Sequence, residues 1–246
     1  MRAMILAAGY GSRLRPLTDS CPKALLTVSG RTLLSIVLDR LVAAGCTEVV
    51  INVHHLAPPI LAFLRRRTGR NLKIMISMEE QLLDTGGALV RMMDLTAGDD
   101  PVLVHNVDVL TDLNLEQLIE EHLHRCAEVT LAVQARPTSR PLMFDDHLQL
   151  LGRPNTPSAG MESTRQRAFA FNGIHVFNPQ ALRGISPHPF SSIDHYIRLA
   201  QQGRPVLGFV LEGWYWRDLG KPGDLEQAEL DVRSGKITLP MTSADA

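Results

Sequence analysis

A glycine-rich loop follows the first apolar run of the sequence, Ala3 to Ala7. Gly9 and Gly11 are separated by one residue, so the backbone can turn sharply and direct successive N–H groups at an anion. Arg13 adds a planar guanidinium that suits phosphate oxygens. Leu14 stands where a dinucleotide fingerprint has its third glycine, and no GKS or GKT sequence follows as in a P-loop. The loop therefore predicts a phosphate site of another kind.

Two aspartates lie where strands are expected to end. Asp108 follows the apolar run VLVHNV, and Asp218 stands in the segment WRDLG. Mg²⁺ prefers one or two carboxylates together with phosphate oxygens and water. Ligands of open α/β sheets bind beyond the carboxyl ends of the strands, where both aspartates are expected. Taken alone, Asp108 fits an ordinary turn at a strand end equally well.

Five segments, in order along the chain, resemble the sugar-1-phosphate nucleotidyltransferases, the pyrophosphorylases that make UDP-, GDP- and dTDP-sugars. The first is residues 5–26, ILAAGYGSRLRPLTDSCPKALL. The others are Leu83-Asp84-Thr85-Gly86-Gly87, Asn106-Val107-Asp108, Phe171-Asn172-Gly173-Ile174-His175 and Trp216-Arg217-Asp218-Leu219-Gly220. The resemblance extends over essentially the whole chain, and five ordered matches are more specific than any one of them.

The resemblance implies an enzyme that transfers a nucleotidyl group from an NTP to a sugar-1-phosphate and releases pyrophosphate. Two polyanions must meet in this reaction, so catalysis depends on positioning and on cationic stabilisation. Mg²⁺ is the implied cofactor, with Asp108 and Asp218 as its ligands. Arg13, Lys23 and Asp108 are the implied catalytic residues, although Lys23 also fits a solvated lysine after a turn. The implied nucleotide-binding set is Leu6, Ala7, Ala8, Gly9, Gly11, Arg13, Lys23, Thr85, Gly86 and Gly87.

The segments that face the sugar in this family are less specific. The resemblance assigns Asn106, Asn172, Gly173 and Arg153 to substrate binding. Asparagine beside glycine is also common in turns, and Arg153 follows glycine where longer relatives have glutamate, so an exposed loop arginine remains an alternative. Val107 replaces the glycine that relatives commonly have before the metal aspartate. Thr85 is also suited to cap the helix that follows it.

The short chain most resembles N-acetylmuramate-1-phosphate uridylyltransferases and the short proteins grouped with mannose-1-phosphate guanylyltransferases. UTP with N-acetylmuramate-1-phosphate is the preferred substrate pair. GTP with mannose-1-phosphate, and dTTP or UTP with glucose-1-phosphate, are alternatives. A non-catalytic nucleotide or sugar sensor is an alternative of another class, although a sensor need not keep both metal carboxylates. A nicotinamide-dependent oxidoreductase is disfavoured by Leu14.

Apolar runs alternate with helical patterns from the first residues, as in a sheet covered on both faces. Strands are expected at about 3–7, 48–53, 72–77, 102–105, 129–134, 169–177 and 206–211, and helices at about 33–44, 58–67, 85–95, 115–125, 192–202 and 223–233. This order predicts an α/β fold with a Rossmann-like, doubly wound, mixed but mostly parallel sheet. Prolines and glycines interrupt the pattern after Arg136, so residues 136–190 are expected to form a small α+β insertion within a single domain, 1–246.

Composition limits the partners. The 246 residues carry 25 Lys and Arg against 26 Asp and Glu, so the cationic excess of a nucleic-acid clamp is missing. The apolar run at the N-terminus is too short for a membrane span, and three widely spaced cysteines predict reduced thiols in the cytoplasm. The expected protein contacts neither nucleic acid nor membrane, and it acts as a monomer or a small homo-oligomer.

Overall fold

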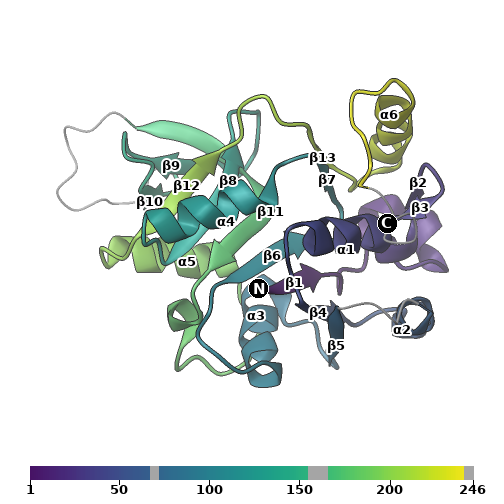
Figure 1. The fold of residues 1–246 in the computed structure, drawn as a ribbon, viewed down its shortest axis with the longest axis horizontal. Coiled ribbons are helices and arrows are strands. Elements are labelled where there is room, and N and C mark those ends of the chain that lie inside the picture. The colour runs from purple at the N-terminus through teal and green to yellow at the C-terminus, as the bar shows by residue number, and fades with distance from the viewer. Residues whose placement is uncertain (67–71, 155–165, 241–246) are drawn as a thin grey trace. The chain divides into compact units, whose positions relative to one another are not determined.

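The computed structural model describes residues 1–66, 72–154 and 166–240 (Figure 1). These residues fold into two compact units. The first unit comprises the described parts of Met1–Leu82, His105–Leu115 and Trp214–Ala246, and the second those of Leu83–Val104 and Glu116–Gly213. The expectation of a single domain is not tested by this division and stays a prediction. Among the described residues, no helix is both long and apolar enough to cross a bilayer.

The first unit is built on a ladder of three parallel strands. It consists of β1 (Arg2–Leu6), β4 (Glu48–Val53) and β5 (Lys73–Met78) in the order β1-β4-β5. Two helices follow these strands along the chain in the expected places, α1 (Leu33–Ala43) and α2 (Ala57–Arg65). The expected end of the second helix at Arg67 lies outside the described residues. The register places Leu6 beside Asn52 and Asn52 beside Ser77, so the carboxyl ends of all three strands lie at one edge.

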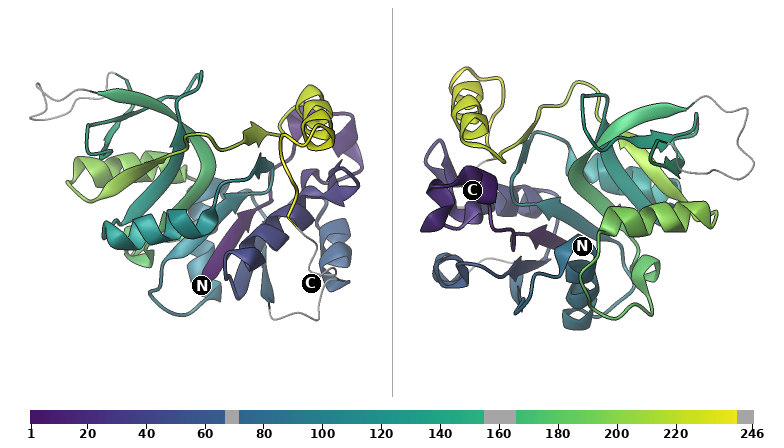
Figure 2. Two further views of the ribbon diagram at one scale, coloured as in Figure 1. Left: turned by 45° about the horizontal axis from the view of Figure 1, so that its top comes forward. Right: turned by 180° about the vertical axis from the view of Figure 1, so that it is seen from behind.

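Shorter elements complete the first unit. β2 (Thr27–Val28) pairs with β3 (Arg31–Thr32), and β7 (Val109–Thr111) pairs with β13 (Trp216–Asp218), both antiparallel. The helix α6 (Pro222–Arg233), yellow in Figure 2, follows β13. The strand β6 (Val102–Asn106) leads the chain from the second unit into the first.

The second unit is built on longer strands of mixed direction. β11 (Arg167–Phe177) pairs antiparallel with β8 (Val129–Gln134) and with β9 (Leu142–Phe144). β12 (Val206–Val210) pairs parallel with β8, and β10 (Leu150–Gly152) pairs with β9. Its helices are α3 (Asp84–Leu95), α4 (Leu115–His124) and α5 (Ser192–Gln201). The register of β11 against β8 shifts between Phe171 and His175, and Gly173 within that shift has φ of 78°.

The expected fold class is confirmed as Rossmann-like, with helices about a mixed sheet. Each longer strand and helix appears within a few residues of its expected bounds. Residues 155–165 of the expected insertion lie outside the described residues. In the described part of 136–190, β9, β10 and β11 pair with one another or with β8. The described part of the segment thus adds strands to a sheet.

Two buried histidines are expected to make the stability of the fold depend on pH. Burial, with smaller contributions from Arg40 and His122 respectively, lowers the pKa of His105 to about 4 and that of His175 to about 3. The unfolded chain, where histidine has a pKa of about 6.5, therefore binds protons that the folded chain does not bind. The resulting stability is complete above about pH 6.5 and falls as the pH drops toward the folded-state pKa values.

We expect each histidine to account for a loss of about 2 kcal/mol in the free energy of unfolding between pH 7 and pH 5. Urea titrations at both pH values measure this loss. His175→Gln should reduce it by about that amount, whereas His147→Gln, at an exposed position, should leave it unchanged. An equal loss in the wild type and in His175→Gln would contradict the assignment.

Candidate active site

The glycine loop folds into a fixed turn after β1. Gly11 has φ of 64°, in the left-handed region that glycine adopts at little cost. Its carbonyl oxygen accepts hydrogen bonds from the backbone N–H of Leu14, 2.8 Å away, and from the hydroxyl of Thr18, 2.9 Å away. Leu14 is fully buried, whereas the side chain of Arg13 is 60% exposed. The turn therefore anchors itself through Leu14 and presents Arg13 to solvent.

The start of this loop is held by a buried polar pair from the neighbouring strands. The backbone N–H of Ala7 donates to Asn52 Oδ1 at 2.7 Å, and Asn52 Nδ2 donates to Glu79 Oε1 at 2.8 Å. Asn52 and Glu79 are both buried, so these bonds also satisfy polar groups that water does not reach. Sequence reasoning missed both residues, because Asn52 interrupts the apolar run EVVINV without belonging to any motif.

The two expected metal aspartates are brought together by the β7–β13 ladder. In its register Asp218 lies opposite Val109, the residue after Asp108. The backbone N–H of Leu219 also donates to the carbonyl oxygen of Asp108 at 2.8 Å. At the other side of Asp108, the N–H of Val107 donates to the carbonyl oxygen of Leu6 at 3.1 Å, which ties this segment to the end of β1. Backbone bonds thus fix both aspartates beside the glycine loop.

Two cations complete this arrangement. Lys23, whose side chain is only 9% exposed, forms an ion pair with Asp108. Arg13 Nη2 lies 3.7 Å from Asp218 Oδ2. We call Arg13, Lys23, Asp108 and Asp218 the charged cluster. All four residues belong to the first unit, and each was predicted from the sequence to bind phosphate or metal.

The surroundings of Asp218 disfavour its ionised form. Burial and the nearby carboxylate of Asp108 raise the pKa of Asp218, and Lys23 and Arg13 act in the opposite direction. A raised pKa means that burial and the neighbouring carboxylate disfavour the ionised carboxylate, which added positive charge would stabilise. A divalent cation would supply that charge.

Steric crowding explains why glycine occupies the last position of the WRDLG segment. A Cβ atom on Gly220 would lie 2.6 Å from Arg13 Nη2 and 3.0 Å from Asp218 Oδ1. Any side chain at this position would therefore displace Arg13 or Asp218. The close approach of backbone and guanidinium explains why this segment closes with glycine.

The donor set suits Mg²⁺ shared with a substrate. Within the described residues, no group of three or more His, Cys, Asp or Glu side chains is placed to hold a metal ion. Asp108 and Asp218 offer two carboxylates, and Mg²⁺ commonly takes one or two carboxylates with phosphate oxygens and water as its other ligands. The residues present therefore fit a magnesium ion that phosphate also binds.

The Thr85-Gly86-Gly87 segment belongs to the second unit, inside the first turn of α3. The expected capping of this helix by Thr85 is wrong. α3 begins at Asp84 and its N-cap residue, Leu83, makes no side-chain cap bond. Thr85 Oγ1 instead accepts a hydrogen bond from the backbone N–H of Ser192 at 2.9 Å, at the first turn of α5. Thr85 lies two residues beyond the N-cap position of its own helix, and its hydroxyl instead accepts a hydrogen bond at the start of another helix.

Both glycines of this segment lie against the chain that precedes α5. A Cβ atom on Gly86 would lie 2.2 Å from the ring of Phe190, and one on Gly87 would lie 2.1 Å from the carbonyl oxygen of His188. The N–H of Gly86 also donates to the carbonyl oxygen of Phe190 at 2.8 Å. Close packing therefore requires glycine at both positions, whatever further contact they make with a nucleotide.

The residues expected to face the sugar also lie in the second unit. Asn172 is fully buried in β11, and its Oδ1 accepts a hydrogen bond from Arg136 Nε at 3.2 Å. Arg136 Nη2 also donates to the carbonyl oxygen of Phe171 at 2.9 Å. Arg153 pairs with Asp194 at 2.8 Å. The basic residue beside the expected sugar strand is thus Arg136, which the sequence did not single out because it follows the end of a strand and precedes a proline.

Comparison with known families gives a match that covers most of the chain. A family model described as Nucleotidyl transferase matches residues 2–235. The chain belongs to this family. It is 35% identical over 235 residues to the N-acetylmuramate alpha-1-phosphate uridylyltransferase of Caulobacter vibrioides, covering 89% of this chain and 92% of that protein. It is 31% identical over 255 residues to the mannose-1-phosphate guanyltransferase of Emericella nidulans, covering 98% of this chain and 68% of that protein.

Solved structures share the fold of this nucleotidyl transferase. A putative glucose-1-phosphate thymidylyltransferase from Bacillus anthracis, in complex with a sucrose, superposes with a TM-score of 0.79 at 18% identity over 98% of each chain. HddC from Yersinia pseudotuberculosis, complexed with GMP-PN, superposes with a TM-score of 0.75 at 21% identity, covering 94% of this chain and 98% of that chain. These likenesses confirm the fold class.

Family membership establishes the class of enzyme. The protein is a sugar-1-phosphate nucleotidyltransferase, as the resemblance of its five segments implied. The roles of its individual residues, and its NTP and sugar, remain predictions.

Proposed function

We propose that the enzyme transfers uridylyl from UTP to N-acetylmuramate-1-phosphate, giving the UDP-sugar and pyrophosphate. The observation that carries the chemistry is the charged cluster, in which two carboxylates and two cations meet beside a glycine turn. The choice of substrates is supported by the 35% identity to the Caulobacter uridylyltransferase, most of whose length this chain covers. A role in cell-wall precursor metabolism follows from the sugar.

The glycine loop and the cations bind and orient the triphosphate. Residues 6–11 line the nucleotide with main-chain groups, and Arg13, exposed above the turn, holds the β- and γ-phosphates and helps pyrophosphate leave. Lys23 neutralises charge about the α-phosphate and the incoming sugar phosphate. Since its side chain is nearly buried, its charge is poorly screened by solvent and acts strongly at short range.

Asp108 and Asp218 would hold Mg²⁺, which when bound stabilises the negative charge that develops on the phosphate oxygens. The backbone bonds of β7 and β13 keep the two carboxylates in place before any substrate arrives. This prior order lowers the cost of arranging the charges during reaction.

Residues of the second unit, and Asn106 of the first, select the substrate. Thr85, Gly86 and Gly87 bind the nucleoside through the first turn of α3, and Asn106, in the chain that leads to Asp108, contacts the sugar phosphate. Asn172 and Gly173 contact the sugar at the irregular stretch of β11, where the register shift frees backbone groups from the ladder. Arg136 orients Asn172 through its Oδ1. Arg153 remains the proposed partner of the sugar phosphate and would exchange its ion pair with Asp194 for that group.

We place the enzyme in the cytoplasm, as a monomer or small homo-oligomer without nucleic-acid or membrane partners. Its three cysteines, Cys21, Cys46 and Cys126, are all free thiols. Free thiols are typical of proteins in a reducing compartment. Size-exclusion chromatography with light scattering measures the oligomeric state.

A substrate panel tests the proposed reaction. The purified protein is incubated with Mg²⁺, each of UTP, GTP and dTTP, and N-acetylmuramate-, mannose- or glucose-1-phosphate, while pyrophosphate release is measured. We expect the highest kcat/KM for UTP with N-acetylmuramate-1-phosphate. Preference for GTP with mannose-1-phosphate, which the match to the guanyltransferases would explain, would refute the substrate assignment. An absence of turnover with every pair, by a protein shown to be folded, would contradict the proposed catalytic role of the charged cluster.

A further inference from the structure

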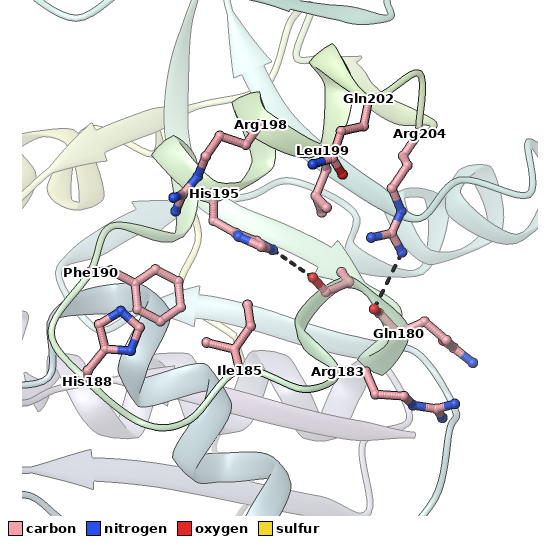
Figure 3. A pocket seen from close by; sticks show the side chains of 11 residues that line it. Gln180, Arg183, Ile185, His188, Phe190, His195, Arg198, Leu199, Gln202 and Arg204 are labelled. Atoms are coloured by element: carbon pink, nitrogen blue, oxygen red, sulfur yellow. Dashed lines mark hydrogen bonds between the residues drawn. The ribbon is translucent and has the colours of Figure 1, made fainter.

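A cavity of about 410 Å³ lies in the second unit, among residues that the proposed reaction does not use. Its walls are the short helical turn Pro179–Leu182, the chain that continues to Phe190, and one side of α5 with the residues after it. Figure 3 shows that Arg198 and Arg204 approach it from the side of α5, with His188 and Phe190 along another wall. The volume suits a small organic molecule.

The charged side chains of this cavity are mostly cationic. Three arginines line it, Arg183, Arg198 and Arg204. Arg204 forms an ion pair with Glu128 and donates to the carbonyl oxygen of Gln180 at 3.4 Å. Arg183 pairs with Asp99 at 2.8 Å, but both side chains are 66% exposed, so solvent weakens that attraction.

Arg198 carries the uncompensated charge. Its guanidinium has no hydrogen bond or ion pair to any residue of the described segments, and it stands on the exposed side of α5 at the cavity. An arginine presents five donors in a rigid fork that matches phosphate and carboxylate oxygens. Arg198, which Figure 3 shows on the same side of the cavity as Phe190, therefore provides the cationic group of a site for an anion.

Aromatic rings form a second kind of surface in the same cavity. The rings of His188 and Phe190 stack with their centroids 4.9 Å apart and an interplanar angle of 29°. Phe190 meets His195 edge to face, with centroids 5.9 Å apart. His195 Nε2 donates to the carbonyl oxygen of Ala181 at 2.7 Å, which fixes the orientation of that ring. Flat, fixed rings favour a ligand with a planar group of its own.

We propose that this cavity is a binding site for a small phosphate ester that carries a planar ring, with the phosphate on Arg198 and the ring against Phe190 and His188. The proposal does not depend on the proposed substrates. None of the residues that line the cavity belongs to the charged cluster, the Thr85-Gly86-Gly87 segment or the residues proposed to contact the sugar.

The same wall is bonded to the first turn of α3. The N–H of Gly86 donates to the carbonyl oxygen of Phe190, and the N–H of Phe190 donates to the carbonyl oxygen of Leu83 at 3.3 Å. The carbonyl of His188 occupies the space where Gly87 lacks a side chain. A ligand held against His188 and Phe190 therefore steadies the chain that fixes Gly86 and Gly87. Occupancy of the cavity is transmitted to this turn through two hydrogen bonds and one packed backbone contact.

Calorimetric titration with phenyl phosphate and inorganic phosphate tests the binding. Arg13→Ala serves as the parent protein, because Arg13 is the exposed cation of the glycine loop and its removal weakens phosphate binding there. Arg198→Ala in this parent should weaken phenyl phosphate binding at least tenfold. Arg91→Ala, an exposed arginine of α3 outside the cavity, should leave it unchanged. Phe190→Leu should weaken phenyl phosphate binding about fivefold with little effect on inorganic phosphate.

Two results of that titration would overturn the proposal. One is that the parent binds no phenyl phosphate at millimolar concentration. The other is that Arg198→Ala binds phenyl phosphate as the parent does. Because the titration needs neither NTP nor sugar, failure of the proposed reaction would not change its outcome, and failure of the binding would leave the reaction untouched.

Hydrogen exchange at Gly86 tests the connection to α3, since its amide donates directly to Phe190. Saturating phenyl phosphate should slow exchange of the Gly86 amide at least threefold in the Arg13→Ala parent. Arg198→Ala at the same concentration should show no slowing. Unchanged exchange in a parent that binds phenyl phosphate would refute the transmission of occupancy to this turn.

Discussion

Replacement of Asp108 by alanine is expected to lower kcat by about 10²-fold or more, because it removes a proposed ligand of the ion that stabilises transition-state charge. The site leaves little to substitute for it, since the described residues place no third acidic or histidine ligand with Asp108 and Asp218. The change also deprives Lys23 of its partner in a nearly buried position, so the lysine is free to move from the phosphate. Steady-state assays of pyrophosphate release at saturating Mg²⁺ measure the effect.

Asp108→Asn separates charge from shape in this experiment. The amide keeps the size of the carboxylate and the backbone bonds on either side of it, but it carries no negative charge. We expect a loss of kcat of similar order, with unfolding by urea close to that of the wild type. Asp146→Ala, at an exposed position, should retain full activity. Activity within threefold of the wild type in Asp108→Asn would show that the metal is held elsewhere.

Gly87→Ala is expected to lower the free energy of unfolding by about 2–3 kcal/mol. Alanine is the better helix former by about 1 kcal/mol, and Gly87 lies inside α3, so propensity alone predicts stabilisation. The added Cβ would, however, lie 2.1 Å from the carbonyl oxygen of His188. That contact is with backbone, so the chain before α5 must move, and overpacking of this kind commonly costs about 1–3 kcal/mol or more. Urea unfolding at pH 7 measures the difference.

Gly223→Ala provides the matched control for that change. Gly223 also lies in a helix, α6, and a Cβ atom there would meet nothing within 4 Å. We expect it to be neutral or stabilising by up to about 1 kcal/mol. Gly86→Ala should behave like Gly87→Ala, but its obstacle is the ring of Phe190, so adding Phe190→Ala should recover part of the loss. Stability of Gly87→Ala equal to that of Gly223→Ala would contradict the steric argument.

Much of the fold could be predicted because its longer elements obey simple periodicities. Helix α1 repeats apolar residues at helical spacing, and β4 is a continuous β-branched run, EVVINV. The charged cluster was also predictable in part, since glycine spacing, an arginine fork and strand-end carboxylates each have a chemical meaning of their own. The resemblance to the family then brought these separate signals together.

The contacts that assemble the cluster could not be predicted. β7 and β13 have three residues each and lie about a hundred positions apart, so neither carries a periodic signal and no local rule pairs them. Asn52 and Glu79 likewise meet only in the folded chain. Thr85 shows a different kind of error. A local rule predicted that it caps its own helix, but in the folded chain its hydroxyl accepts a hydrogen bond from Ser192 of another helix. Each case depends on tertiary packing.

The segmented make-up of the first unit has a consequence for the order in which the site can form during synthesis. Arg13 and Lys23 emerge early from the ribosome, whereas Asp218 belongs to the third segment of the same unit, after the whole described part of the second unit has been made. β7 therefore cannot pair until β13 has been synthesised. Until then, Asp108 is present in the nascent chain without the strand that pairs beside it. Contacts of such long separation form slowly. The charged cluster is accordingly completed only late in translation.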